Sequence, residues 1–403
     1  MDPTTGQPDS APSRRGRRVG RRLHRAAPLA LVTAVATVAV ACSSGSSSTA
    51  TTGTTPTTGS PRPPAVSTAA GLPPIRHVFV IVLENAGYAS TFGTPAADPY
   101  LATDVSASGA QLSQYHGIGH FSNPNYIALV SGQAPNPTNQ ADCQVFADFA
   151  AAAAVGTGGQ VSGSGCIFPS QVQTVAGQMD AAHLSWKAYM QDMGNIPNRE
   201  PAVCAHPAIG AVDHTQEAVP GDGYATRHDP FVYYPPIVDN PARCASHVRP
   251  YSETATALSH DGAVPNFVFI SPDTCHDGHD ATCPGGKPGG LVSADAWLAA
   301  NVPPILNSTA YKDNGALFIT FDESLPTDLG GCCASGIFAN GSNGGGRVGL
   351  LALSPLAKVG AVIHHAYDHN SLLRTIEDAF GIHEHLNNAG SPRTSAMTNL
   401  FLP

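Results

Sequence analysis

Four short runs of apolar residues stand out along the chain, at 78–83, 267–270, 317–321 and 348–353. Each is too short for a helix, and continuous apolar runs of this length are typical of strands buried on both faces. Segments with a helical spacing of apolar residues lie between them, at 125–131, 171–182, 294–306 and 371–380. This alternation predicts an α/β fold with a mostly parallel central sheet flanked by helices.

Acidic and amide side chains follow three of the predicted strands, at the point where each strand ends. Glu84 and Asn85 follow the first run, Asp273 comes shortly after the second, and Asp322 and Glu323 follow the third. Ligands of open parallel sheets bind outside the carboxyl ends of the strands. We therefore expect these side chains to meet at one edge of the sheet.

The first 41 residues predict an export signal rather than part of the fold. Seven arginines lie within 14–25, and an uncharged run fills 26–41, which is the order found in secretory signals. The string Ala-Val-Ala-Cys at 39–42 resembles the lipobox of bacterial lipoproteins, which predicts membrane contact through a lipidated Cys42 and a place in the cell envelope. The lipobox usually has Leu where Ala39 stands, so cleavage near residue 41 by an ordinary signal peptidase, giving a secreted protein, is the alternative.

Two further segments complete the predicted organisation. Residues 42–74 are mostly Ser, Thr, Gly and Pro and bury too little apolar surface to offset their ordering entropy, so they predict a tether. Residues 75–403 contain no second low-complexity break or internal repeat and are predicted to form one catalytic domain. Within that domain, the stretch 143–251 is rich in Pro, His and Cys and is expected to form long loops over the sheet edge.

The charge of the exported part argues against nucleic acid as a partner. The whole chain carries a formal net charge of -9, and residues 1–41 contribute seven arginines and two aspartates, so removing this net +5 leaves -14. An acidic protein repels polyanions. A phosphate site in it would need local cations, which metal ions can supply.

The cysteine count indicates disulfides. Eight cysteines remain after Cys42, an even number in a chain predicted to be exported. CxxC pairs do not recur, which disfavours a structural zinc site. We expect the adjacent Cys332 and Cys333 to pair with other cysteines rather than with each other.

Ser122 lies two residues before Pro124, at the start of the predicted helix 125–131. The commoner meaning of such a string is that the serine is an N-cap with proline in the first turn. The functional interpretation places the hydroxyl at a helix N-terminus, where free amides and the dipole favour a bound phosphate. The two interpretations are compatible.

Carboxylates that follow the strands predict a divalent metal beside this serine. Coordination to a cation lowers the pKa of a hydroxyl and makes it a nucleophile. Glu84, Asp322 and Glu323 offer hard oxygen ligands, and Asn85 adds an amide oxygen. Oxygen ligands suit magnesium, calcium or manganese, and nearby imidazoles also admit zinc or iron, so the identity of the metal stays open.

Histidines supply further candidates. The segment 273–280 packs three carboxylates and two imidazoles into eight residues. It is either a polar loop held by a disulfide or a second cluster of metal or phosphate ligands, in which His276 or His279 protonates the leaving-group oxygen. His369 precedes the helical pattern 371–380 and is either a capping or packing residue or part of the site.

Five strings of the chain resemble the bacterial phosphoesterase family of the alkaline-phosphatase-like superfamily, which includes acid phosphatases and phospholipases C of the phosphatidylcholine type. They are HVFVIVLEN at 77–85, HxSxPNY at 120–126 with SG at 131–132, SPD at 271–273, FDES at 321–324 and HNSLLRTIED at 369–378. The resemblance spans about residues 75–390. The chain lacks the extra C-terminal domains of the phospholipases and is more similar to small secreted acid phosphatases, some described as phosphatidylinositol-3-phosphatases.

This resemblance implies a set of roles. It implies a metal held by Glu84, Asn85, Asp322 and Glu323, with Ser122 as both ligand and nucleophile and a phosphoserine intermediate that water hydrolyses. It also implies that histidines stabilise the transferring phosphoryl group. The catalytic candidates besides Ser122 are four histidines and the asparagine of the serine string: His120, His276, His279, His369 and Asn125. Where some superfamily members have a His-Gly string after the acidic pair, this chain has Cys332 and Cys333, which favours one metal over two.

We therefore expect an exported, metal-dependent enzyme that hydrolyses phosphate monoesters, including phosphoinositide lipids as possible substrates. One alternative is a phosphodiesterase similar to phospholipase C, which needs room for a second ester group. The other is a lipoprotein that binds a phosphate compound without turnover. Replacement of Ser122 by alanine separates catalysis from binding.

Overall fold

The structure is a computed structural model that describes residues 71–93, 97–150, 154–156, 159–260, 262–333 and 344–403. They belong to the larger of two compact units of the chain, 63–403. The predicted export signal, Cys42 and the tether up to residue 70 lie outside the described residues. Among the helices that are described, none is long and apolar enough to cross a membrane.

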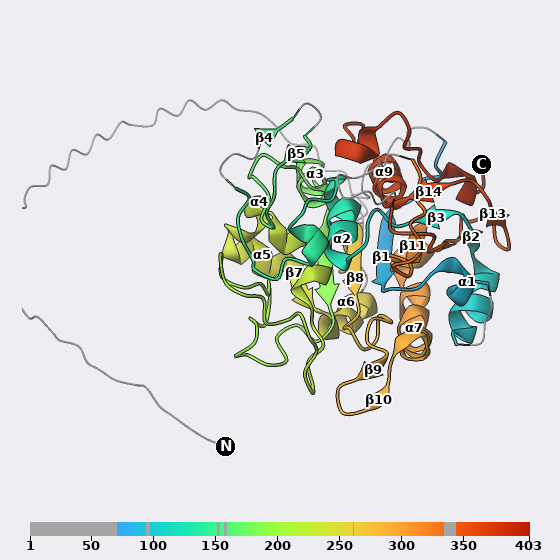
Figure 1. Ribbon diagram of the computed structural model, residues 1–403. Helices are drawn as coiled ribbons and strands as arrows, with labels where there is room; N and C mark the ends of the chain where they lie inside the picture. Colours follow the sequence, from blue (N-terminus) through green and yellow to red (C-terminus); the bar gives the residue numbers. More distant parts are fainter. Residues whose placement is uncertain (1–70, 94–96, 151–153, 157–158, 261, 334–343) are drawn as a thin grey trace, which may run out of the picture. The chain divides into compact units, whose positions relative to one another are not determined.

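An eight-stranded mixed sheet forms the centre of the domain as far as it is described (Figure 1). Its strand order is β13-β2-β12-β11-β1-β8-β6-β7. Five neighbouring strands are parallel, which confirms the predicted fold class. These are β11 (Gly315–Phe321), β1 (His77–Leu83), β8 (Phe267–Ser271), β6 (Trp186–Met190) and β7 (Val248–Pro250).

One predicted strand, the run 348–353, is not parallel to its neighbours. The run 348–353 contains β12 (Leu350–Leu353), which is antiparallel to β11 and to β2 (Ala110–Leu112), whereas β13 (Val362–Ile363) is parallel to β2. A parallel strand needs a crossover that carries the chain back along the sheet. The chain instead enters β12 at the end where β11 finishes, because Thr320 pairs with Leu350.

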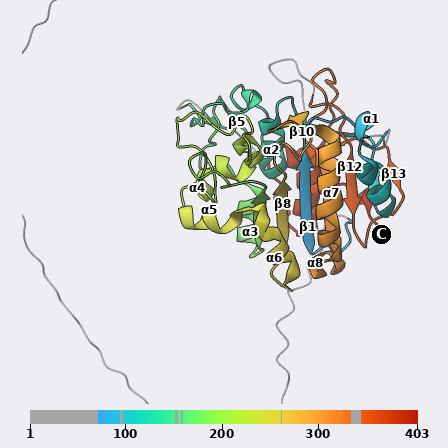
Figure 2. The same cartoon turned by 90° about the horizontal axis from the view of Figure 1, so that it is seen from below.

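Helices cover both faces of the sheet. In Figure 2, α7 (Gly290–Asn307) lies along the face turned towards the viewer. On the other side, α2 (Ser122–Ser131) and α9 (His369–Ala379) pack against each other (Figure 1). With α3 (Val175–Ala181), these are the four predicted helices. Their ends differ from the prediction by at most four residues, as is usual for boundaries read from a sequence.

The remaining helices and strands are short. The helices are α1 (Tyr88–Thr91), α4 (Pro235–Val238), α5 (Pro241–His247), α6 (Thr254–Ser259) and α8 (Thr309–Lys312). The strand pairs are β3 (Tyr115–His116) with β14 (Tyr367–Asp368), β4 (Ala154–Val155) with β5 (Val161–Ser162), and β9 (Thr282–Cys283) with β10 (Lys287–Pro288).

The eight cysteines form four disulfides, but the expectation for the adjacent pair was wrong. Three bridges staple loops: Cys143–Cys166, Cys204–Cys244 and Cys275–Cys283. The fourth joins Cys332 to Cys333. The other six cysteines pair among themselves, so the adjacent two are left with each other.

A buried glutamate in α9 gives a test of the domain's stability. Glu377 is fully buried, its Oε1 accepts the backbone N–H of Leu386 at 2.8 Å, and burial raises its pKa to about 8. An unfolded glutamate ionises near pH 4.3, so between that value and about 8 the folded state holds an extra proton and stability falls as the pH rises.

We expect Glu377→Gln, which keeps the acceptor, to flatten this pH dependence and to raise the free energy of unfolding at pH 9 by about 1 kcal/mol or more, since one pKa unit corresponds to about 1.4 kcal/mol. Denaturant titrations at pH 5 and pH 9 measure the difference. The exposed Glu384→Gln serves as the control. Equal stability of wild type and Glu377→Gln at pH 9 contradicts the prediction.

Candidate active site

Glu84, Asn85 and Asp322, which follow the parallel strands β1 and β11, lie next to one another at one edge of the sheet. Leu83 of β1 pairs with Phe321 of β11, so Glu84 and Asp322 emerge side by side. The backbone N–H of Asn85 donates to Asp322 Oδ1 at 3.1 Å. On the other side of β1, the chain after β8 returns to the same place, because the backbone N–H of Glu84 donates to the carbonyl of Asp277 at 2.8 Å.

Ser122 reaches this edge as the first residue of α2. Its Oγ donates to Glu84 Oε2 at 2.8 Å, and the side chain is buried. The N-cap position is held by Phe121 rather than by the serine, with φ 72° and ψ 146°. Positive φ is a strained conformation for a bulky residue and costs about 1–3 kcal/mol. The strained turn directs the hydroxyl of Ser122 at the carboxylates.

The amides at this helix end are not free in the way that the sequence interpretation assumed. The backbone N–H of Asn123 donates to Asp142 Oδ1 at 2.9 Å. Burial raises the pKa of Asp142, and the positive charge of Arg227 opposes this shift. A carboxylate therefore already lies at the positive end of the helix dipole.

Asn125 holds the loop before the serine. Its Oδ1 accepts the backbone N–H groups of Ile118 and Gly119 at 2.7 and 3.1 Å. Its Nδ2 donates to the carbonyls of Gly119 and Phe121, each at 2.9 Å. Both ends of the amide are used by the backbone, so these contacts indicate a positioning role for Asn125 rather than contact with a substrate.

The carboxylates of the site lack enough positive partners of their own. Among the described residues, Glu84 Oε1, Asp277 Oδ2 and Asp322 Oδ2 are buried without a hydrogen bond. Burial raises the pKa of Glu84 well above its usual value, and the charges of Asp322 and Asp277 raise it further. Burial and the charge of Glu323 act in the same direction on the pKa of Asp322. Such a cluster of hard oxygen donors fits a divalent cation.

Glu323 is paired with a histidine. His120 Nδ1 contacts Glu323 Oε2, and His120 Nε2 lies 2.9 Å from the backbone carbonyl of Asp328. The hydrogen bond to Glu323 raises the pKa of His120. Both ring nitrogens face oxygen atoms, an arrangement that favours the doubly protonated ring. His120 thus reaches the site through Glu323.

His228 is the functional candidate that the sequence interpretation missed. Its Nε2 lies 3.3 Å from Glu84 Oε1 and its Nδ1 lies 3.2 Å from Asp277 Oδ2. The ring is buried and stacks on Tyr126, with centroids 5.0 Å apart. Burial lowers the pKa of His228, as does the charge of Arg227. The signal in the sequence was the string Arg-His-Asp-Pro at 227–230, which precedes an apolar run inside a polar stretch.

Arg227 carries a permanent positive charge at the site, and it contacts His279. The backbone N–H of His279 donates to Asp277 Oδ1 at 2.7 Å, and its ring Nε2 lies 3.3 Å from Arg227 Nη2. Arg227 is buried and also donates to the carbonyl of Gln216 at 2.9 Å. Its charge lowers the pKa values of Glu84 and Asp277, against the larger effect of their burial.

His276 makes its side-chain hydrogen bonds outside the carboxylate cluster. Its Nδ1 lies 2.5 Å from Asp273 Oδ2 and 2.9 Å from Gln191 Nε2, and the hydrogen bond to Asp273 raises its pKa. Neither partner touches Ser122 or Asp322 through a hydrogen bond recorded among the described residues. The structure thus joins His276 to Asp273 rather than to the carboxylate cluster.

His369 contacts the backbone of Asp322, which is one of the candidate metal ligands. It is fully buried, its Nε2 lies 2.6 Å from the backbone carbonyl of Asp322, and its Nδ1 lies 3.0 Å from the hydroxyl of Tyr115. Since a carbonyl only accepts, Nε2 carries the proton and Nδ1 accepts from the tyrosine. Burial lowers the pKa of His369 to about 4, so the ring is neutral near pH 7. His369 holds the backbone of Asp322.

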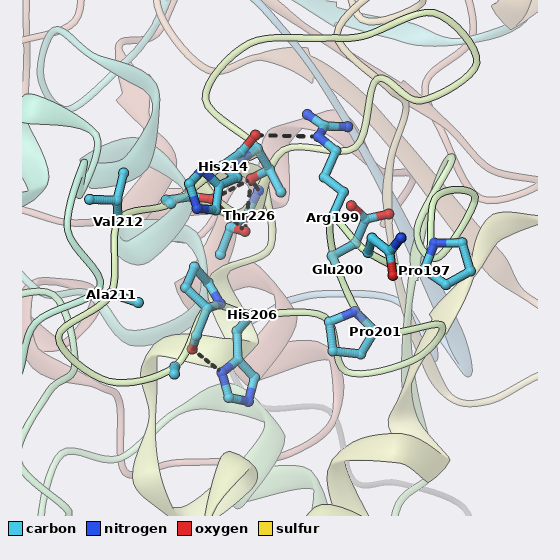
Figure 3. A pocket seen from close by; sticks show the side chains of 14 residues that line it. Pro197, Arg199, Glu200, Pro201, His206, Ala211, Val212, His214 and Thr226 are labelled. Atoms are coloured by element: carbon cyan, nitrogen blue, oxygen red, sulfur yellow. Dashed lines mark hydrogen bonds between the residues drawn. The ribbon is translucent and has the colours of Figure 1, made fainter.

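The stretch 143–251, which was expected to form long loops, also supplies β6 and β7 of the central sheet, so that expectation was wrong in part. Its loops, which include Arg227 and His228, line an open pocket of about 340 Å³ to which Arg199, Glu200, His206 and Thr226 contribute (Figure 3). Next to the pocket, the Oγ1 of Thr215 donates to that of Thr226 at 2.9 Å. This stretch thus fixes the residue directly before Arg227.

The site combines a serine at a helix N-terminus with a carboxylate cluster on the edge of an α/β sheet, and a model of the phosphoesterase family matches residues 96–383. The chain therefore belongs to the phosphoesterase family, which confirms the resemblance read from the five strings. The chain spans about half the length of several curated relatives that it matches, at 50%, 44% and 48% of their lengths.

Two of the relatives illustrate the similarity. The chain is 24% identical over 258 residues to the phosphate-repressible acid phosphatase of Penicillium chrysogenum, covering 64% of this chain and 50% of that protein. It is 24% identical over 255 residues to the phosphatidylinositol-3-phosphatase of Mycobacterium tuberculosis, covering 63% and 66%. Among solved structures, the phosphonate monoester hydrolase of Agrobacterium radiobacter aligns with a TM-score of 0.47 at 11% identity, covering 81% and 78%.

Proposed function

We propose that this chain is a metal-dependent phosphatase that hydrolyses phosphate monoesters with Ser122 as the nucleophile. The observation that carries the proposal is the hydrogen bond from Ser122 Oγ to Glu84 Oε2, 2.8 Å long, beside buried carboxylate oxygens that accept no hydrogen bond among the described residues. In the proposed site, a cation and a phosphate oxygen both lie next to this hydroxyl. Acid phosphatases among the relatives support the same reaction class.

Residues at the sheet edge would hold the cation. Glu84, Asp322 and Glu323 offer carboxylate oxygens, Asn85 offers its amide oxygen and Ser122 its hydroxyl. When bound, a divalent cation lowers the pKa of the serine hydroxyl and neutralises charge on the phosphoryl group. One cation is the simplest assignment.

Side chains of the protein carry out the proton transfers and stabilise the charge of the phosphoryl group. Glu84 accepts the hydroxyl proton of Ser122, whose Oγ forms a bond to phosphorus while the bond between phosphorus and the alcohol oxygen breaks. A protonated His279 donates a proton to the departing alcohol, and Arg227 offsets the negative charge of the phosphoryl oxygens. Water oxygen then bonds to phosphorus while the bond between phosphorus and Ser122 Oγ breaks. Glu84 returns its proton to Oγ, and His279 takes a proton from the water. His120 and His369 hold Glu323 and Asp322 in place.

Initial rates separate the proposal from its alternatives. The full chain should hydrolyse p-nitrophenyl phosphate in the presence of a divalent metal and should be much slower on bis-p-nitrophenyl phosphate. Faster turnover of the diester indicates a phosphodiesterase instead. Binding of a phosphate ester without turnover of either compound indicates a binding protein. Adding phosphatidylinositol 3-phosphate tests the lipid substrate that the mycobacterial relative's name supports.

We also propose that the protein is exported. The arginine-rich start and the apolar run at 26–41 support this, and so do the disulfides of the domain, because such bonds persist in oxidising compartments. Lipidation of Cys42 would hold the enzyme at the envelope on its Ser- and Thr-rich tether. Mass spectrometry of the mature N-terminus distinguishes a lipidated Cys42 from cleavage near residue 41.

The contact of His369 with the backbone of Asp322 gives a further prediction. We expect His369→Phe to weaken the apparent affinity for the activating metal by about tenfold or more, because supporting contacts of this kind typically contribute that much. Activity measured against metal concentration gives the constant. His365→Phe, an exposed neighbour in the same segment, is the control. Unchanged metal affinity in His369→Phe removes the supporting role.

A further inference from the structure

Three large apolar side chains are exposed on the two segments that carry the nucleophile and the acidic pair. Phe121 directly precedes Ser122 and is 53% exposed, whereas Leu325 and Leu329 follow Glu323 and are 60% and 50% exposed. Single exposed apolar residues are ordinary, but a group of them beside a functional site marks a binding surface. We call these three residues the apolar rim.

The imidazole of His120 joins the two segments that carry the apolar rim. His120 contacts Glu323 through Nδ1 and the carbonyl of Asp328 through Nε2. Phe121 is the residue after His120, Leu325 is two residues after Glu323, and Leu329 is the residue after Asp328. Each side chain of the rim therefore stands within two residues of this hydrogen-bonded group.

Phe121 combines a strained backbone with an exposed ring. Glycine adopts a φ of 72° without strain, whereas phenylalanine does so at a cost. The strained turn positions Ser122, whereas the ring itself is outside the hydrophobic core and makes no ring contact among the described residues. An exposed aromatic ring next to a nucleophile is available for contact with a ligand bound there.

The depth of the site indicates which part of a ligand reaches the apolar rim. Ser122 is 3% exposed and Glu323 is 5% exposed, so a phosphoryl group bound there is recessed among polar groups. The alcohol part of the ester extends outwards from it. Apolar surface at the entrance favours an alcohol that is itself apolar, because contact removes both surfaces from water.

We infer that the apolar rim binds an apolar group on the alcohol side of the phosphate ester, so that the enzyme prefers monoesters bearing an aryl ring or acyl chain over those of small polar alcohols. This inference rests on the proposed function and narrows its substrate class. An aryl phosphate and a lipid phosphate share the required chemistry, and a comparison of monomeric and aggregated substrates separates these two sources.

The test measures a ratio of rates in the full chain with metal present. The quantity is kcat/KM for 1-naphthyl phosphate divided by kcat/KM for glycerol 2-phosphate. We expect this ratio to fall about tenfold in the double variant Leu325→Ser, Leu329→Ser and again in Phe121→Ala, from the apolar contact area removed. Leu402→Ser is the matched control, since Leu402 is 49% exposed and its backbone N–H bonds to Leu356, near the opposite end of β12 from the site.

Two further measurements complete the test. Phe121→Gly should lower the same ratio while keeping at least the wild-type melting temperature, because glycine relieves the strained φ. Dihexanoyl phosphatidic acid assayed below and above its critical micelle concentration should show the loss in both states. A loss confined to micelles, or an unchanged naphthyl ratio in all rim variants, overturns the inference. Wild type inactive on every ester means instead that the proposed function has failed.

Discussion

Replacing Ser122 by alanine is expected to lower kcat for p-nitrophenyl phosphate by about a thousandfold or more. The variant retains Glu84, Asp322 and the rest of the site but has no oxygen that can form the bond to phosphorus, and loss of a covalent nucleophile typically removes most of the rate enhancement. Initial rates with saturating metal measure the effect. The affinity for a non-hydrolysed phosphate analogue should change far less than kcat.

A second serine of the same helix provides the control. Ser131 Oγ donates to the carbonyl of Ile127 at 2.8 Å and accepts from the Tyr234 hydroxyl at 2.7 Å, at the far end of α2 from the site. Ser131→Ala should lower stability and leave the chemical step largely intact. A kcat in Ser122→Ala close to that of wild type would remove the serine from the mechanism.

Asp322→Asn should weaken the apparent metal affinity by about a hundredfold or more, because an amide nitrogen replaces one of two possible ligand oxygens and the negative charge is lost. The hydrogen bond from the backbone of Asn85 can persist, since the amide oxygen still accepts. Activity should return in part at high metal concentration. Rates measured over a wide range of metal concentrations give the change.

The same variant should have the opposite effect on the metal-free protein. Burial and the charge of Glu323 raise the pKa of Asp322, so the ionised side chain destabilises the fold when no cation is bound. With chelator present at pH 8, Asp322→Asn should therefore melt at a higher temperature than wild type. Asp313→Asn, at an exposed residue bonded to Arg76, is the control. An unchanged metal requirement together with a lower melting temperature would contradict the assignment of Asp322.

The sequence predicted three strands of the parallel core, β1, β8 and β11, because they are continuous apolar runs, and a buried run must lie inside. It did not predict β6 and β7, because their sequences WKAYM and VRP contain polar residues and were expected to belong to loops. It did not predict the direction of β12, since an apolar run of four residues looks the same in either orientation. The start of α2 was also displaced. Serine is a common N-cap, whereas the positive φ that moves the cap to Phe121 depends on the hydrogen bonds of Asn125 with the preceding loop.

The part of the site that follows the strands could be read from the sequence, because parallel strands bring their carboxyl ends together. Glu84, Asp322 and Glu323 are of this kind. His228 could not be found in the same way, since it comes from the stretch 143–251 and reaches Glu84 and Asp277 only through tertiary packing. His276 lies in the dense polar segment 273–280 as His279 does, and only the fold shows that its bonds lead to Asp273 and Gln191.

The most direct test of the central claim is to find where the phosphoryl group is held during turnover. Full-length protein is mixed with metal and 1-naphthyl phosphate, quenched in acid within the first turnovers and digested, and the peptides are analysed by mass spectrometry. We predict a phosphoryl group on Ser122 in the wild type and none in Ser122→Ala. Rapid turnover by the wild type with the phosphoryl group on another residue, or on none, would contradict the proposed mechanism.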